Sequence, residues 1–406
     1  MKVKKSAENM VFFEYIKFIN TERQKANQLT ARRDAVKKGD PDYKLISADI
    51  DSISKKVIAY QNNLIATHSA KFVSKVVKMS MDVKIPEAPR RPDGSLIDSN
   101  FAYHYFRDHY FDNIDLNDDR LVNTSVFHNK LDYFFSQNML LQQPDTIVKY
   151  AYIFCDKLNQ KSEMFKYAVI HITSTFEKSK IMGMDKVFVK MGERYYCSKN
   201  TEGKSPAYWM AEDKLKDLCE KVTTNKVLVQ GVRPPNISLR DTSDVNWKDF
   251  YSIKADYTIL YFWESDCGHC KKSTPKLQKL YAEKLKARNV EIFAVSKAID
   301  EDFEKWKKFI KDHKLTFINV ALTNTLFRAA QEDARQFIPK YTTIEALNYS
   351  DTYDVMSTPR IFILDKDKKI IGKGLSVAQL EDFMDRIQGF KDAPKIIEPD
   401  PEDVNH

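Results

Sequence analysis

Two cysteines separated by only two residues are the part of this chain best suited to chemistry. They stand in the sequence Cys267-Gly268-His269-Cys270, shortly after an apolar run that ends at Trp263 and at the start of a segment with helical spacing. The chain has five cysteines in 406 residues, so a chance pair at this spacing is expected only about 0.06 times. Because two intervening residues permit an intrachain disulfide, the pattern indicates a redox-active pair.

The alternative for a pair with this spacing is a structural zinc site, which needs four ligands. The other three cysteines, Cys155, Cys197 and Cys219, are scattered through segments with helical periodicity and stand beside apolar residues. We therefore expect no bound metal, and we expect these three cysteines to be inert buried thiols.

A helix that begins at the pair would make Cys267 nucleophilic. The N-terminus of a helix supplies unpaired N–H groups and the positive end of the dipole, which stabilise a thiolate. His269 favours the thiolate further, which destabilises the disulfide and shifts the couple toward the oxidising side. Trp263 has two interpretations, since it can pack beneath the pair or simply fill the core.

The elements that must position this motif belong to a chain long enough for two or three domains. With 43% hydrophobic and 30% charged residues, the composition is typical of a folded globular protein. Only ten glycines are present, which disfavours turn-dense all-β architectures and makes helix the expected majority. No apolar run approaches the roughly 18 residues of a membrane-spanning helix.

The excess positive charge lies in the N-terminal part of the chain. Residues 1–235 hold 38 basic and 29 acidic groups, against a net charge of +8 for the whole chain. Because Lys and Glu are interspersed rather than gathered in a stripe, we expect solvated helix faces and no nucleic-acid partner. The aromatic-rich stretch 101–111 favours packing between helices over stacking on bases.

Residues 1–225 indicate an all-α helical array. A run without Gly or Pro extends from Ser6 to about Lys38 and ends at Gly39. Apolar residues at steps of three and four between positions 46 and 64 then predict a second helix packed against the first as an antiparallel hairpin. Further helical patterns follow at about 72–79, 100–112, 125–141, 145–158, 162–181 and 207–222.

The pattern changes at Val227, and residues 226–390 indicate an α/β domain with a mixed central sheet, because strands alternate with helices. The tail, residues 391–406, is rich in proline and acidic residues and is expected to be disordered. We expect strands at 257–263, 290–296, 316–321, 361–365 and 370–374, and helices at 268–286, 302–312 and 377–387.

The α/β part resembles the thioredoxin superfamily, and more closely the membrane-associated, periplasmic thiol-disulfide oxidoreductases of the TlpA and ResA type. Residues 231–239 are similar to that family's lead-in G-x-x-A-P-x-x-x-L, and an aromatic pair ending at Trp263 precedes the cysteines as in F-W-x-x-x-C-x-x-C. Pro275 stands at the helix-kinking proline, and Thr358-Pro359 looks like the cis-proline with its preceding residue. The resemblance implies that Thr358 pairs through its backbone with the substrate chain.

The upstream half also looks familiar. Segments 85–89, 111–115, 127–133 and 183–189 resemble Bacteroidetes thioredoxin-like proteins, in which an uncharacterised helical domain precedes the redox domain. Such proteins look like secreted or lipid-anchored envelope proteins with a further N-terminal domain. The resemblance implies a periplasmic or envelope location. The absence of a signal peptide at the start of the chain by itself fits either a cytosolic protein or a truncated chain. Because Met1 stands where the helical domain of the resembling proteins would start, we expect part of a longer protein, with membrane association only through a missing N-terminal anchor.

The chain departs from the family at several positions. Related envelope reductases often carry a glutamate three residues after the second cysteine, where Ser273 stands here. Ordinary thioredoxins carry a buried acid where Tyr261 stands, and Glu264 is the nearest substitute, although we expect it at the surface. Residues 324–354 form a longer connection to the cis-proline than usual, with an extra helix at 326–337, which either shapes substrate choice or is an ornamental surface helix.

These observations predict a thiol-disulfide oxidoreductase that acts on protein disulfides, most simply as a reductase, with Cys267 attacking and Cys270 resolving. Because C-G-H-C resembles the motif of protein disulfide isomerases, isomerase or oxidase activity stays open. A further alternative is a helical interaction module with a thioredoxin-like scaffold. The expected partners are protein thiols or disulfides and a redox donor or acceptor protein. No nucleotide cofactor is expected, because no glycine-rich loop follows a strand.

Overall fold

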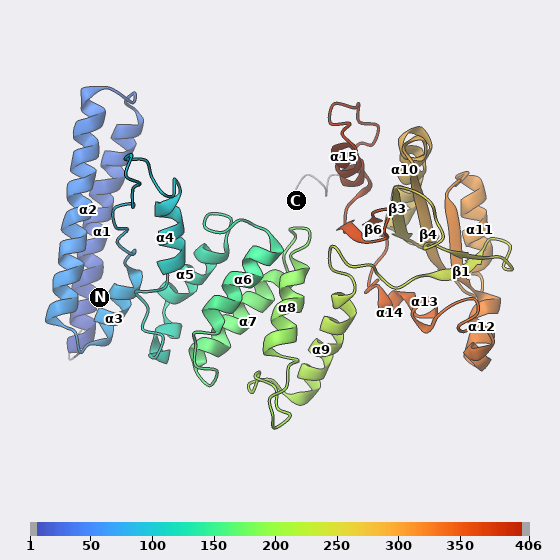
Figure 1. Ribbon diagram of the computed structural model, residues 1–406, viewed down its shortest axis with the longest axis horizontal. Coiled ribbons are helices and arrows are strands. Elements are labelled where there is room, and N and C mark those ends of the chain that lie inside the picture. Colours follow the sequence, from blue (N-terminus) through green and yellow to red (C-terminus); the bar gives the residue numbers. More distant parts are fainter. Residues whose placement is uncertain (1–5, 400–406) are drawn as a thin grey trace. The chain divides into compact units, whose positions relative to one another are not determined.

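The computed structural model describes residues 6–399, which divide into two compact units. The first unit holds the residues up to 142 together with 149–168, and the second holds 143–148 together with the residues from 169 onward. This division passes through two helices and differs from the boundary expected near 225. The change from helices to strands does fall where the sequence pattern changes, since a helix ends at Lys226 and the first strand begins at Ser238 (Figure 1).

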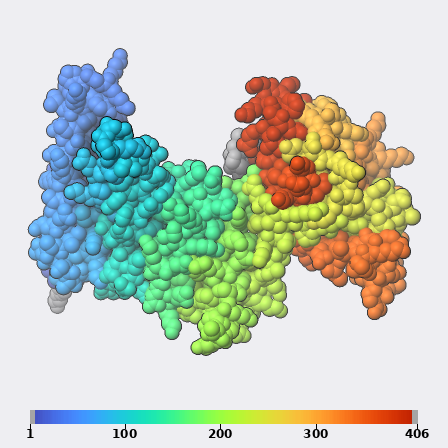
Figure 2. All heavy atoms as spheres, viewed as in Figure 1, coloured from blue at the N-terminus to red at the C-terminus, as the bar shows by residue number. Residues whose placement is uncertain are grey.

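The first two helices form the expected hairpin. Helix α1 (Ala7–Asp34) begins after Ser6, whose hydroxyl accepts a hydrogen bond from the Asn9 amide, and α2 (Pro41–Thr67) begins after Asp40, which caps it in the same way. In Figure 2, side chains fill the space between these helices and the next one (blue). That helix is α3 (Phe72–Ser80), and the buried residues at the seam are Tyr15, Leu64, Val73 and Val77.

The end of the aromatic stretch, at Tyr110 and Phe111, packs inside the first unit as expected, whereas Tyr103 earlier in the stretch is 43% exposed. The ring of Phe111 lies 4.6 Å from that of Phe134 and 4.2 Å from that of Phe154, centroid to centroid. These rings fill the space between helices rather than forming an exposed stacking platform. The elements involved are α4 (Phe101–His109), η1 (Asp119–Asn123), α5 (Ser125–Phe135), α6 (Pro144–Cys155) and α7 (Glu163–Glu177), the last two shared between the units.

Two helices of the second unit lie very close together. They are α8 (Asp185–Tyr195) and α9 (Glu212–Lys226). A Cβ added to Gly192 on α8 would lie 2.4 Å from a methyl group of Val222 on α9, so only glycine permits this approach. Within residues 6–399, no helix combines the length and apolarity needed to cross a lipid bilayer.

The rest of the second unit contains a seven-stranded sheet. Five strands match the expected ones, whereas the short hairpin formed by the first two strands was not predicted, because its run Ser238–Asp249 is mostly polar. The strands are β1 (Ser238–Asp241), β2 (Trp247–Asp249), β3 (Tyr257–Phe262), β4 (Val290–Ala298), β5 (Ile318–Thr323), β6 (Arg360–Leu364) and β7 (Ile370–Lys373).

The strand order is β2-β1-β5-β4-β3-β6-β7. Strand β4 pairs in parallel with both β3 and β5, whereas β1, β2, β6 and β7 join by antiparallel pairing. The sheet is therefore mixed, as expected. Strand β3 lies between β4 and β6, with five of its six residues buried, and this fixes the place from which the cysteine motif emerges.

Helices cover both faces of the sheet (Figure 1). One face carries α10 (Gly268–Leu280), α11 (Asp302–Asp312) and α15 (Val377–Ile387), which pack on the sheet through a core that includes Trp306. The opposite face carries the insertion between β5 and β6, which buries Tyr353. The predicted extra helix is present there. The insertion consists of α12 (Asn324–Asp333), η4 (Ala334–Gln336), α13 (Ile344–Leu347) and α14 (Tyr349–Thr352).

The prediction of a disordered tail is wrong for residues 391–399, and residues 400–406 lie outside the described part. Ile397 is 6% exposed and packs into the core around α15. The buried carboxylate of Glu381 accepts hydrogen bonds from the amides of Ile396, at 3.0 and 3.2 Å, and Ile397, at 2.9 Å. The polar composition suggested that the tail would not pack, but two adjacent isoleucines and the buried carboxylate of Glu381 hold residues 396–397 against α15.

Candidate active site

Cys267 lies where β3 leads into α10 and is the N-cap residue of that helix. Its sulfur accepts a hydrogen bond from the Cys270 amide at 3.4 Å. The side chain therefore occupies the place where unpaired N–H groups and the positive end of the helix dipole favour an anion. This is the position that the sequence predicted.

The two thiols of the motif differ in their surroundings, and both are free cysteines in this structure. Cys267 is half-buried, whereas Cys270 is fully buried. Burial raises the pKa of the Cys270 thiol to about 12. Burial also opposes ionisation of Cys267, but hydrogen bonds from the Thr358 side chain and from the amides of Cys270 and His269 outweigh it, so the pKa of Cys267 lies below its usual range.

The peptide bond between Thr358 and Pro359 is cis, which confirms the expectation taken from the family resemblance. The thiol of Cys267 donates to the carbonyl oxygen of Thr358 at 3.2 Å. This contact belongs to the protonated sulfur, because a thiolate has no hydrogen to donate. The residues meet because β6 pairs antiparallel with β3, with Arg360 opposite Phe262.

The other residues expected at the motif take different positions. His269 is exposed, and a Cβ on Gly268 would meet nothing within 4 Å. Pro275 lies inside α10. Trp263 is 1% exposed and belongs to the same core as Cys270, which agrees with the core interpretation of this residue. Glu264 is exposed, as expected.

A buried pair of hydroxyl groups occupies the place where the family resemblance led us to look for an acid. The hydroxyl groups of Tyr261 and Thr274 lie 2.8 Å apart, and both residues are fully buried. Burial raises the pKa of Tyr261 far above its usual value. Ser273, the position where relatives carry glutamate, is half-buried. A neutral hydroxyl pair therefore lies in the core beneath this end of the sheet.

The expectation of inert thiols is wrong for two of the three remaining cysteines. Cys197, after the end of α8, and Cys219, on α9, form a disulfide with Cα atoms 5.6 Å apart. Cys155 is buried and takes no part in a disulfide, as expected. The pairing escaped sequence reasoning because 22 residues separate the two cysteines, and only the antiparallel packing of two helices brings them together.

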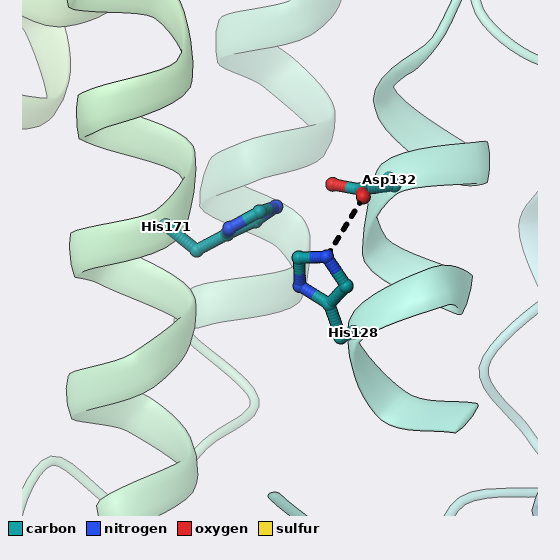
Figure 3. A group of neighbouring side chains, drawn as sticks. All are labelled: His128, Asp132 and His171. Atoms are coloured by element: carbon teal, nitrogen blue, oxygen red, sulfur yellow. Dashed lines mark ion pairs between the residues drawn. The ribbon is translucent and has the colours of Figure 1, made fainter. Parts of the chain in front are cut away.

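A histidine and an aspartate form an ion pair on α5 in the first unit. His128 Nε2 and Asp132 Oδ2 lie 3.1 Å apart, one helical turn from each other (Figure 3). His171, also drawn in Figure 3, belongs to the second unit. The pair alone supplies two ligands, fewer than the three protein ligands of a typical catalytic zinc site. It therefore makes no metal site by itself.

Parts of the chain match known protein families and relatives. Residues 255–370 match the thioredoxin-like family, and residues 55–216 match a domain of unknown function, DUF5106. The thiol-disulfide oxidoreductase ResA of Bacillus thuringiensis is 30% identical over 162 residues, which are 39% of this chain and 78% of the relative.

Solved structures are similar to parts of the chain. A domain of a possible thiol-disulfide isomerase from Cytophaga hutchinsonii is 31% identical, covering 40% of this chain and 94% of that one, with a TM-score of 0.31. A thioredoxin-like protein from Bacteroides caccae covers 74% of this chain and 98% of its own, at 14% identity and a TM-score of 0.47. On the sequence relatives, the chain belongs to the thioredoxin-like thiol-disulfide oxidoreductases that include ResA.

Proposed function

We propose that this protein reduces disulfide bonds in other proteins through Cys267 and Cys270. The thiolate of Cys267 attacks one sulfur of the substrate disulfide, forming a mixed disulfide and releasing the second substrate sulfur as a thiolate that takes up a proton. Cys270 then loses its proton and attacks Cys267. The substrate leaves with both sulfurs reduced, and the two enzyme cysteines, which have given two electrons to the substrate, are left joined as a disulfide.

The unequal surroundings of the two thiols support this order of attack. Cys267 is half-buried at the helix N-terminus with a lowered pKa, whereas Cys270 is fully buried with its pKa raised to about 12. A thiol that is both accessible and ionised attacks first, because the thiolate is the nucleophile. The buried thiol can react only with a sulfur brought to it, and that sulfur is Cys267 in the mixed disulfide.

The direction of electron flow follows from the reduction potential of the pair. Equilibrating the protein against graded thiol buffers and counting free thiols measures this potential. We expect a value at or below about −250 mV, as for reductants, whereas about −120 to −180 mV would make the protein an oxidase or isomerase. A protein with no reversible two-electron couple would contradict the proposal altogether.

We also place the protein in an oxidising compartment outside the cytoplasm. The disulfide between Cys197 and Cys219 supports this location, since disulfides persist in such compartments and are rare in the cytosol. Alkylating intact cells with and without a reductant, followed by peptide mapping, tests it. Cys197 and Cys219 should be protected until the reductant is added, and alkylation without reductant would place the protein in a reducing compartment.

A further inference from the structure

A groove of about 810 Å³ lies in the second unit, at one edge of the sheet. One wall consists of the end of α7, the connection that follows it and the start of α8, and it includes Ile181 and Phe188. The other wall consists of the start of β6 and the turn after β7, and it includes Arg360 and Leu375. The first wall lies within the stretch that matches the domain of unknown function.

The groove lies at the same end of the sheet as the reactive cysteine. Arg360, which lines the groove, pairs with Phe262 at the end of β3, five residues before Cys267. It also stands two residues after Thr358, whose carbonyl accepts from the Cys267 thiol. Two residues of extended chain span about 7 Å. The groove residue Arg360 is therefore only about that far along the backbone from Thr358, whose carbonyl contacts the sulfur.

Direct contacts fix the first wall of the groove, which we call the helical wall, to the sheet. The ammonium of Lys373 on β7 bonds to Asp185 on α8 at 2.6 Å and to the carbonyl of Leu228 at 2.8 Å. A Cβ on Gly372 would lie 3.4 Å from the sulfur of Met182, which packs against the sheet's core. The groove is therefore preformed, and a ligand would not have to assemble it.

The lining combines charged residues, several of them paired with one another, with an exposed apolar side chain. Lys373 is paired with Asp185, and Lys221 on the rim bonds to Glu177 at 2.8 Å, so each has an acidic partner. By contrast, the side chain of Ile181 in the groove is 49% exposed.

The loop between the groove and Cys267 adds a second apolar surface. Its Met356 is 86% exposed and stands two residues before Thr358. An unbranched thioether side chain adapts to differently shaped apolar partners. One exposed apolar residue thus lies in the groove, and another lies in the loop that leads from the groove residue Asp354 to Thr358.

We propose that this groove binds the polypeptide segment next to the disulfide-bonded cysteine of a substrate and selects segments that carry an apolar side chain. The inference rests on the proposed function, because a protein disulfide held at Cys267 must lead its own chain away from the sulfur past Thr358. It gives the helical wall a part in substrate selection. An extended segment crosses Met356 and places an apolar side chain against Ile181 and Leu375.

The test uses the full chain in reduced form and activated peptide disulfides. Each probe is a capped nine-residue peptide with one central cysteine joined to thionitrobenzoate. The attack of Cys267 forms an enzyme–peptide disulfide and releases coloured thionitrobenzoate, which gives the rate. One peptide carries leucines on both sides of the cysteine in a serine and glycine background, the second carries serines instead, and cysteine–thionitrobenzoate alone is the third probe.

The readout is the ratio of the leucine-peptide rate to the serine-peptide rate. We expect about ten or more for the natural sequence, since burying one leucine is worth at least that factor. The ratio should fall toward one in the double variant Ile181→Ser, Met356→Ser. Val245→Ser is the matched control, because Val245 is 70% exposed in the β1–β2 turn at the opposite edge of the sheet and should keep the high ratio.

Two results would overturn the groove proposal, namely a ratio near one in the natural sequence or a high ratio that survives in the double variant. Failure of the proposed function is distinct from both. In that case Cys267 would not react even with cysteine–thionitrobenzoate, which needs no groove.

Discussion

The two cysteine pairs of the second unit share a residue type and differ in every other respect. Cys267 and Cys270 are free thiols three positions apart at the start of a helix. Cys197 and Cys219 are 22 positions apart and bonded to each other between two helices. The first pair has one half-exposed sulfur beside N–H donors, and the second has neither sulfur at the start of a helix. Position on the elements, together with spacing along the chain, separates the candidate reactive pair from the structural disulfide.

The surroundings of each pair explain the contrast. Beside Cys267 lie the amide of Cys270 and the Thr358 carbonyl, polar groups that exchange contacts as the sulfur gains or loses its proton. Cys197 packs against an apolar cluster that includes Phe188 and Val222 of α8 and α9. A polar environment supports a change of charge state, whereas an apolar one favours the neutral disulfide.

The largest expected effect comes from the first pair. Cys267→Ser should lower the rate of disulfide reduction by at least about a thousandfold, because the attacking sulfur is lost. Cys270→Ser should instead accumulate mixed disulfides, visible as reductant-sensitive bands on gels. Cys197→Ser is the matched control and should keep its activity. Turnover that survives in Cys267→Ser would contradict the assignment of Cys267 as the attacking residue.

The second effect concerns the disulfide between Cys197 and Cys219. Replacing both Cys197 and Cys219 with serine should lower the free energy of unfolding of the second unit by about 3 kcal/mol, as for a closed loop of this length. Denaturant unfolding followed by circular dichroism measures it. The reduction potential of the Cys267–Cys270 pair should not change, and a shifted potential would show that the two pairs are coupled.

Two glycines sharpen the contrast further. Gly192→Ala should destabilise the protein by about 1–3 kcal/mol, because the new methyl group would lie 2.4 Å from Val222 and force α8 and α9 apart. Gly268→Ala, within the motif, meets nothing within 4 Å and should change stability little. Thermal unfolding of the two variants and the natural sequence under the same conditions measures the two stability losses. Equal losses in both would show that the close approach of α8 and α9 does not matter.

The smallest effect is on pH dependence. Alkylation of the reduced protein, followed by peptide mapping, should give Cys267 a midpoint below about 8.5, the ordinary cysteine value. The pKa of Cys267 is lowered, so its thiolate contributes stability above the ordinary pKa, and this is lost as the pH falls through the lowered value. Cys270, with a pKa of about 12, should remain unmodified at neutral pH. A Cys267 midpoint at or above 8.5 would contradict the assignment.

Much of the fold could be predicted because its signals are local. Apolar steps of three and four predicted the α1–α2 hairpin, and the apolar run at Tyr257–Phe262 predicted the central strand. The β1–β2 hairpin was missed because its short, polar strands are held by pairing rather than by their own composition. The tail was misjudged because Ile396 and Ile397 find partners on α15, which is near only in space.

Some features of the candidate site could likewise be predicted from the sequence, and others could not. The order Cys267, Pro275, Thr358-Pro359 could be read from the sequence because it follows a family pattern. The unequal burial of the two thiols and the contact between Tyr261 and Thr274 could not be read, because each depends on residues that meet only across the packed core.

The sequence by itself determined that a strand leads into a helix whose first residues are C-G-H-C, since hydrophobic pattern and spacing act over a few residues. Only the tertiary structure decided which cysteines are bonded, which thiol is buried and where a groove opens beside the reactive end of the sheet. These properties depend on contacts between segments far apart in sequence. Such contacts form only when the chain packs, because bringing distant segments together costs conformational entropy that local pattern alone does not offset.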